Sequence, residues 1–270
     1  VGGTSGIAAA VGISLSKNEI GNQVTASIDN ADDGVTTTVG DIKLTATESA
    51  TITARGAAAS AAVAFGGTAG VALSGAGADA TNLISTQTGS SASNSTLDSA
   101  GAVTLNADDT SSIDATIVAA SVAAAGGGTA GVGASIGAAI ARNLIGYDLD
   151  GNKVGGGVEA KLTDTSVQAV GALSQQARAK QTVDAQVLAG SVALSAGGAA
   201  GASLSGAGVS ATNKIGTTVN AQIDGDGATG IEAASVSLKA TDSSTISSDA
   251  GAASLAGSVG GAAGVAVSVG

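Results

Sequence analysis

Cysteine, histidine, proline, methionine and tryptophan are absent from this chain of 270 residues, which has a single Phe and a single Tyr. Without cysteine there is no disulfide framework, thiolate chemistry or zinc–thiolate site. Without histidine the chain lacks the commonest general base and the commonest transition-metal ligand. The absence of proline, beside 43 glycines, excludes collagen-like and polyproline architectures. A core almost without aromatic side chains must be thin, because only small residues can fill it at native density.

Basic residues are also scarce: 10 Lys and Arg stand against 21 Asp and Glu, which gives a net charge of −11. This balance opposes binding to nucleic acid and to anionic membranes, so we expect no nucleic-acid partner. Residues 116–141 carry no charge and are long enough to cross a bilayer as a helix. Their Ala and Gly drive membrane insertion poorly, and each glycine costs a helix about 1 kcal/mol. We therefore expect no transmembrane segment.

A glycine pair that opens a short small-residue motif occurs five times, at steps of 64, 61, 70 and 63 residues. An asparagine follows the first glycine by 16 residues in the four complete copies. Such a period indicates a stacked array of similar units, in which these positions are structural. The pairs include Gly66 and Gly67, Gly127 and Gly128, and Gly197 and Gly198, and the asparagines are Asn18, Asn82, Asn143 and Asn213. The units are 1–65, 66–126, 127–196 and 197–259, with a fifth beginning at 260–270.

Each unit contains alternating runs that predict β-strands. Val11-Gly-Ile13-Ser-Leu15 is such a run, and Ile42-Lys-Leu44-Thr-Ala46 is another. The segment between the fixed asparagine and the latter run varies in length from unit to unit, which is typical of surface loops. We expect these loops to project from one side of the array. The prediction is an all-β, elongated repeat array with units of about 64 residues, either a β-solenoid of the parallel β-helix type or a row of tandem small β-sandwich units.

The order of motifs resembles a known family. Each unit runs through Val-x-Leu-x-Ala, an Ala/Ser-rich run, Gly-Gly-x-Ala-Gly-Val and Asn-x-Ile. This pattern is similar to the repeats of giant bacterial exoproteins described as filamentous-haemagglutinin-like or leukotoxin-type filamentous adhesins. The resemblance covers the whole chain and implies a β-solenoid that is exported and displayed on the cell surface. A unit of this length would accommodate three coils of about 21 residues each.

Closely spaced carboxylates beside glycine make three segments candidates for calcium binding, because Ca²⁺ takes hard oxygen ligands from tight turns. In unit three, Asp148, Asp150 and Asn152 match the first three side-chain positions of an EF-hand-type loop, and Glu159 matches the twelfth. Lys153 stands where that loop needs glycine, and the same residues also favour ordinary turns. The predicted fold requires no cofactor, and calcium is the ion that these residues would suit. The candidate ligands in units one and four are Asp29, Asp32 and Asp33, and Asp224 and Asp226.

Two function classes follow, and enzymatic catalysis is not one of them, since no acidic pair recurs outside the turns. The first is a structural stalk or filament segment of a large exported bacterial surface adhesin. The second is a binding module whose variable loops contact a glycan or protein of a host or neighbouring cell. Aromatic residues are typical contact residues, so Tyr147 in the longest loop is the candidate contact. The chain begins and ends inside a repeat, so we expect a segment of a longer protein that, made alone, associates end to end.

Overall fold

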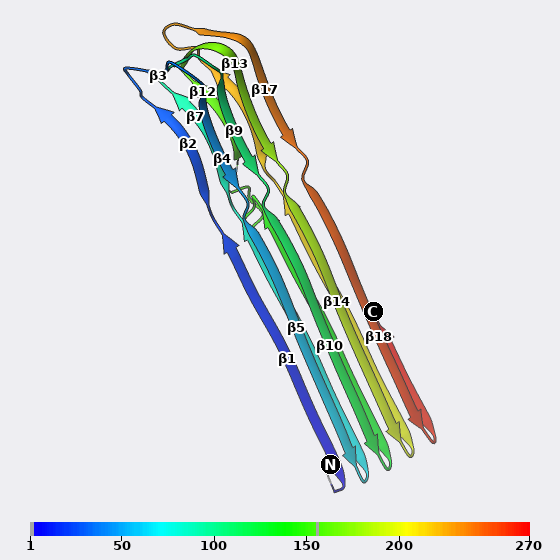
Figure 1. Ribbon diagram of the computed structural model, residues 1–270. Helices are drawn as coiled ribbons and strands as arrows, with labels where there is room; N and C mark the ends of the chain where they lie inside the picture. Colours follow the sequence, from blue (N-terminus) through cyan, green and yellow to red (C-terminus); the bar gives the residue numbers. More distant parts are fainter. Residues whose placement is uncertain (1–2, 155–156) are drawn as a thin grey trace.

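A computed structural model describes residues 3–154 and 157–270, and every regular element in it is a β-strand. Val1 and Gly2, where the first unit begins, lie outside the described residues. The strands form four parallel sheets, which we number I to IV in chain order and in which each strand pairs with its equivalent in the next unit. The molecule is a β-solenoid, as one of the two predicted architectures required (Figure 1).

The bounds of the strands repeat from unit to unit. Sheet I contains β1 (Ser5–Ile20), β6 (Ala69–Ile84), β11 (Ala130–Ile145), β15 (Ala200–Ile215) and β19 (Ala263–Val269). Sheet II contains β2 (Gln23–Asp29), β7 (Gln87–Ser93), β12 (Gly157–Thr163) and β16 (Thr218–Asp224). Sheet III contains β3 (Val35–Thr37), β4 (Ile42–Glu48), β8 (Thr96–Ser99), β9 (Val103–Asp109), β13 (Ser166–Ala179) and β17 (Ile231–Asp242). Sheet IV contains β5 (Thr51–Gly66), β10 (Ser112–Gly127), β14 (Thr182–Gly197) and β18 (Thr245–Gly260).

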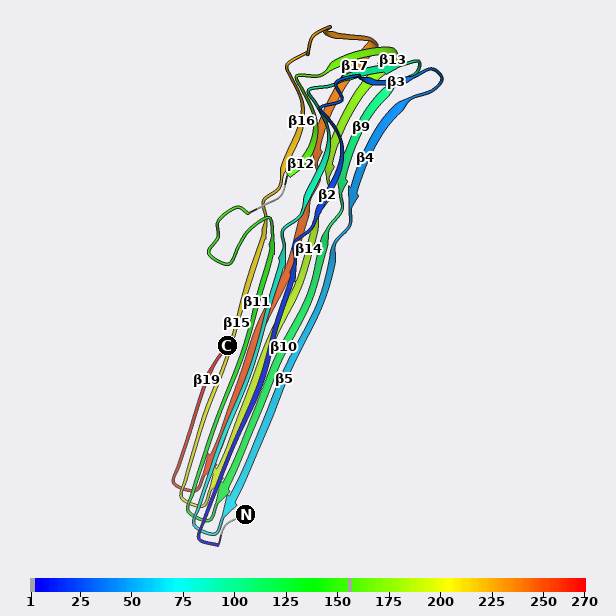
Figure 2. The ribbon, with the colours of Figure 1, turned by 90° about the vertical axis from the view of Figure 1, so that its left-hand side faces the viewer.

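Each coil is long and flat. The chain runs along sheet I and then sheet II, reverses at a loop that we call the tip, and returns through sheets III and IV to the Gly-Gly turn (Figures 1 and 2). Sheet I packs on sheet IV, and sheet II packs on sheet III. We call the breaks between I and II and between III and IV the waist. At about 3.3 Å per residue, the run from β1 to the end of β2 is about 80 Å long.

The expected division of each unit into three coils is wrong, because one unit makes one coil. The register pairs each residue with its equivalent one whole unit away, as in Ser5 with Ala69 and Ala130 with Ala69. The cause lies in the Ala-, Gly- and Ser-rich runs, which hold no turn residue between the waist and the Gly-Gly pair and so continue as strands of 16 residues. Uninterrupted pairing across all units also excludes separate β-sandwich domains.

The core changes along the coil. Between the Gly-Gly turn and the waist it consists of alanine with a few larger residues, such as Ile117 and Val187. At the waist, Ile84 and Ile145, which follow the fixed asparagines, pack with Ile113. Toward the tip, leucine and valine from sheets II and III fill the space. The thin core expected from the lack of aromatics therefore occupies the half of the coil nearest the turn.

The glycine pairs have a steric reason. A Cβ on Gly127, the first of its pair, would lie 2.0 Å from the Ala130 carbonyl oxygen across the turn. A Cβ on Gly128, the second, would lie 2.1 Å from the carbonyl oxygen of Gly67 in the previous coil. The same contacts recur at Gly66, Gly67, Gly197 and Gly198, at 1.9 to 2.6 Å. Only glycine allows the chain to reverse here and the turns to stack at strand spacing.

The variable loops do not all project from one side, contrary to the expectation. The extra residues of units one and four lie at the tip, between β2 and β3 and between β16 and β17. Those of unit three lie at the waist, between β11 and β12, where a loop stands away from the sheets (Figure 2). Residues 116–141 belong to β10, the Gly-Gly turn and β11, and the described part of the chain contains no helix able to cross a membrane.

Candidate functional site

An amide ladder runs through the interior where sheet I approaches the waist. The Nδ2 group of Asn18 donates to Oδ1 of Asn82 at 2.8 Å, and Asn82 donates likewise to Asn143 at 2.8 Å. Asn143 donates to Asn213 at 2.7 Å, and Asn213 donates to Ser248 Oγ at 3.0 Å. The Asn82 and Asn143 side chains are fully buried. Because Asn82, Asn143 and Asn213 each both donate and accept, the ladder links the amides of successive coils and holds the coils in register.

A second polar column, which the sequence reasoning missed, crosses from sheet IV to sheet I. Ser121 Oγ and Ser135 Oγ share a hydrogen bond of 2.6 Å, and so do Ser191 and Ser205. These serines are buried, so each hydroxyl needs the other as its partner. The signal in the sequence is a serine six residues before and eight residues after a Gly-Gly pair. The same bond joins Ser60 with Ser74 and Ser254 with Ser268.

A buried carboxylate at the waist was also missed. Asp109 is 2% exposed, and its Oδ1 accepts hydrogen bonds from the backbone N–H and the hydroxyl of Ser111, at 2.8 and 2.6 Å. Its Oδ2 accepts from Thr86 Oγ1 at 3.1 Å and from Gln181 Nε2 at 2.7 Å. Four hydrogen bonds satisfy one buried carboxyl group and tie waist breaks of two consecutive coils together. The Asp-x-Ser spacing returns at Asp242 and Ser244.

The candidate calcium ligands of unit three lie on the waist loop, where Asp148 is already engaged. Its Oδ1 accepts the backbone N–H of Asn152 at 2.8 Å, and its Oδ2 accepts the Asn152 side-chain amide at 3.0 Å. These bonds lower the pKa of the Asp148 carboxyl, with the side-chain bond the larger cause. Asp150 lies in the turn that Gly151 closes by donating to the Asp148 carbonyl at 3.2 Å. Glu159 lies apart from this turn, within strand β12.

The acidic residues of units one and four lie at the tip. Asp29 accepts a hydrogen bond from Ser93 Oγ at 2.7 Å, and this bond, followed by one from Ser27, lowers the pKa of the carboxyl. Asp32 and Asp33 form a turn in which the N–H of Gly34 donates to the Ala31 carbonyl at 2.9 Å.

The acidic residues of unit four also lie at the tip. Asp224 ends β16 and lies 3.5 Å from Lys161 Nζ, and Asp226 directly precedes the turn at 227–229. Within residues 3–154 and 157–270, no three acidic side chains are grouped so as to hold a metal ion.

Tyr147 lies on the waist loop and packs on its own chain. The ring covers Gly216 of the next coil, where an added Cβ would come within 2.4 Å of the ring carbon Cε2. The Lys214 ammonium lies 5.4 Å from the ring centre, which is within range of a cation–π interaction. Tyr147 is only half-buried, so part of the residue remains accessible.

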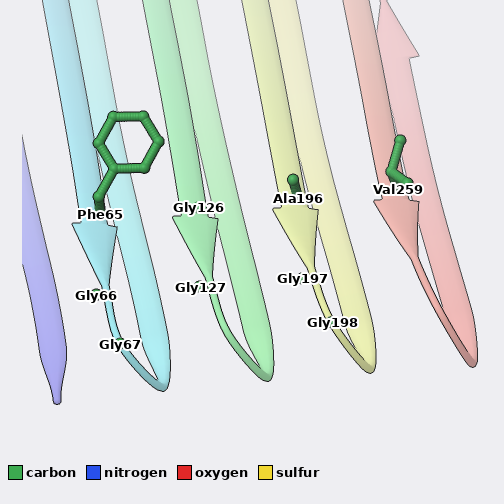
Figure 3. Close-up of a pocket in the computed structure, with 9 residues that line it drawn as sticks. All are labelled: Phe65, Gly66, Gly67, Gly126, Gly127, Ala196, Gly197, Gly198 and Val259. Carbon is green, nitrogen blue, oxygen red and sulfur yellow. The ribbon is translucent and has the colours of Figure 1, made fainter.

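A shallow groove of about 400 Å³ crosses the outer face of sheet IV beside the Gly-Gly turns (Figure 3). Phe65 and Val259 lie at its two ends, and Gly126 and Ala196 lie between them in the same row. The lining consists only of Phe, Gly, Ala and Val, so it offers no polar side chain to orient a small molecule. We compared the chain with protein-family models, curated proteins and solved structures, and none of them matched it.

Proposed function

We propose that this chain is a structural stalk or filament segment of a large exported bacterial surface adhesin. The observation that carries the proposal is the constancy of the interior, in which the same asparagine bond and the same serine bond recur from coil to coil. A cross-section that repeats in this way suits a rigid, extendable body. The resemblance of the repeats to those of filamentous adhesins supports the same conclusion and indicates an extracellular or cell-surface location.

The dimensions favour a broad filament over a slender stalk. Each coil uses about 64 residues but adds only one strand spacing of about 4.8 Å to the stack. An extension of 100 Å would therefore need about 21 coils, or roughly 1,300 residues. The same coil is about 80 Å wide. The coil is therefore an inefficient spacer, but it is an efficient way to build a wide, flat filament with the tip loops along one edge.

Immunogold electron microscopy of intact source cells tests this proposal, with antibodies raised against the tip loops. We expect label on extended surface structures before permeabilisation, and loss of that label after mild protease treatment of whole cells. Label that appears only in permeabilised cells would contradict the proposal.

The waist loop of unit three supports the second candidate function, a binding module for a cell-surface glycan or protein. This loop carries the only Tyr and interrupts an otherwise regular surface. Replacing residues 146–156 with the two-residue junction Ser85-Thr86 of unit two would remove the loop and keep the coil. Loss of binding to a glycan array or to cells in this variant, with circular dichroism unchanged, would favour the binding module. Equal binding by both proteins would favour the filament.

A further inference from the structure

The outer face of sheet IV carries an uncharged field next to the Gly-Gly turns. We define this apolar field as the outward-facing residues of 57–65, 118–126, 188–196 and 251–259, which are in register across β5, β10, β14 and β18. These four segments contain no charged residue. Seven of the nine large hydrophobic side chains of the field are 40 to 71% exposed: Val63, Phe65, Val122, Leu188, Leu194, Leu255 and Val259. The other two, Val118 and Val192, are half-buried.

The field has relief of the kind that interdigitates with another surface. Large side chains lie over glycines of the neighbouring coil, as Phe65 does over Gly126 and Leu194 over Gly257. A row of small residues crosses the field at Ala120 and Gly190, beside the larger Val122. Three hollows of about 300 to 400 Å³ follow from this alternation of large and small rows.

We propose that this field is an interface with a second copy of the chain, packed face to face. Its area is about 30 Å by 19 Å, so a pair would bury about 1,100 Å² in total, above the threshold of about 1,000 Å² for specific association. Lipid is a poor occupant, because the unpaired backbone groups of open sheet edges are costly in hydrocarbon. The outer face of sheet I is also uncharged next to the turns, and Asp79 lies in the row that borders this part toward the waist.

Charge determines the relative direction of the two copies. Toward the waist, the field borders a row with Arg55 and Asp249 and then a row with Asp114 and Asp184. If the strands of the two copies ran in the same direction, Asp114 would face Asp184 of the second copy. Opposite directions place these acidic rows at the two ends of the interface and keep them apart. The antiparallel pair then centres on the row of Val122, where this residue faces its own equivalent.

A single cysteine tests this geometry, because the natural chain has none. In Val122→Cys, a short bis-maleimide should join two copies covalently. Thr116→Cys is the matched control on the same strand and face, because its equivalent in the antiparallel pair lies about 40 Å away. The reagent does not report end-to-end stacking, which separates equivalent residues of successive copies by about 20 Å. The cross-linking result therefore tests the face-to-face interface separately from the proposed filament.

Charge placed in the field should abolish the cross-link. Leu194→Lys in the Val122→Cys background should weaken association about tenfold or more, because an unpaired ammonium would be buried. The lysine stem still covers Gly257, and circular dichroism checks the fold. Gln186→Lys, on the same strand outside the field, should leave the yield unchanged.

Three results would overturn the proposal: no covalent dimer from folded Val122→Cys, equal yields from Thr116→Cys, or full yield with Leu194→Lys. Neutral phosphatidylcholine vesicles can also be added to the protein. Loss of the covalent dimer, together with co-sedimentation of the protein with the vesicles, would identify lipid as the occupant of the field and would also refute the proposal.

Discussion

Replacing Asn82 with alanine removes the central link of the amide ladder. The side chain donates to Asn143 and accepts from Asn18, so two hydrogen bonds of 2.8 Å are lost together. Each bond contributes about 1 kcal/mol net, and the fully buried Asn143 carbonyl oxygen left without a donor adds about 1–3 kcal/mol. We expect Asn82→Ala to lower the free energy of unfolding by about 2–4 kcal/mol, measured by guanidinium denaturation followed by circular dichroism.

Asn18→Ala provides the internal comparison, since Asn18 lies on the edge strand β1 and makes one ladder bond. We expect it to cost about 1 kcal/mol, because removal of the Asn18 side chain at the open end of the stack lets water reach the Asn82 carbonyl oxygen. In a double-mutant cycle, Asn82→Ala and Asn143→Ala together should cost less than the sum of the two single changes, since their shared bond is lost only once. A change of less than about 0.5 kcal/mol for Asn82→Ala would refute the ladder, because that is the range of ordinary surface substitutions.

Four further outcomes can be checked on the same protein. Gly127→Ala should destabilise the chain by about 1–3 kcal/mol or more in guanidinium, whereas Gly75→Ala, which has open space, should be close to neutral. The bonds from Asn152 that lower the pKa of Asp148 stabilise the waist loop above the unfolded carboxyl pKa of about 3.9 and are lost as the pH falls through the folded value, so the protection of the Asn152 amide from hydrogen exchange, relative to an unfolded peptide, should fall there. If calcium binds this loop, millimolar Ca²⁺ should raise the Tm, and replacing Asp148 and Asp150 with Ala should remove part of the shift; no shift would leave the loop as a turn. Polar capping coils should stop open-ended association in analytical ultracentrifugation at tens of micromolar and leave nothing larger than the face-to-face dimer, and a clean monomer without caps would contradict end-to-end association.

The sequence predicted the repeat, the all-β class and the structural importance of the Gly-Gly and asparagine positions. Fixed spacing marks these features directly, because glycine is needed for the close approach at each turn and asparagine for the amide ladder. The width of the coil was not predictable in the same way. In the Ala/Gly/Ser-rich runs the side chains on both faces of a strand are small. The alternation of apolar and polar residues therefore does not distinguish one long strand from several short ones.

The interior partners across the two layers were harder still. The Ser121–Ser135 bond depends on how the Gly-Gly turn sets sheet IV against sheet I, and Asp109 accepts hydrogen bonds from both breaks of its own coil and from the next coil. Neither relation is visible until the path of the chain is known. The waist position of the unit-three loop was missed for the same reason, since length variation alone does not say which of two breaks in a coil receives the insertion.

The central claim, that one repeat forms one coil, can be tested with two spin labels. Arg55 and Asp249 lie on the outer face of sheet IV, three coils apart in one row. Cysteines at these positions can be labelled specifically because the natural chain has none. Electron–electron double resonance should give a backbone separation of about 14 Å, three strand spacings, broadened by the label linkers. A separation near 43 Å, as expected if each repeat formed three coils, would contradict the account.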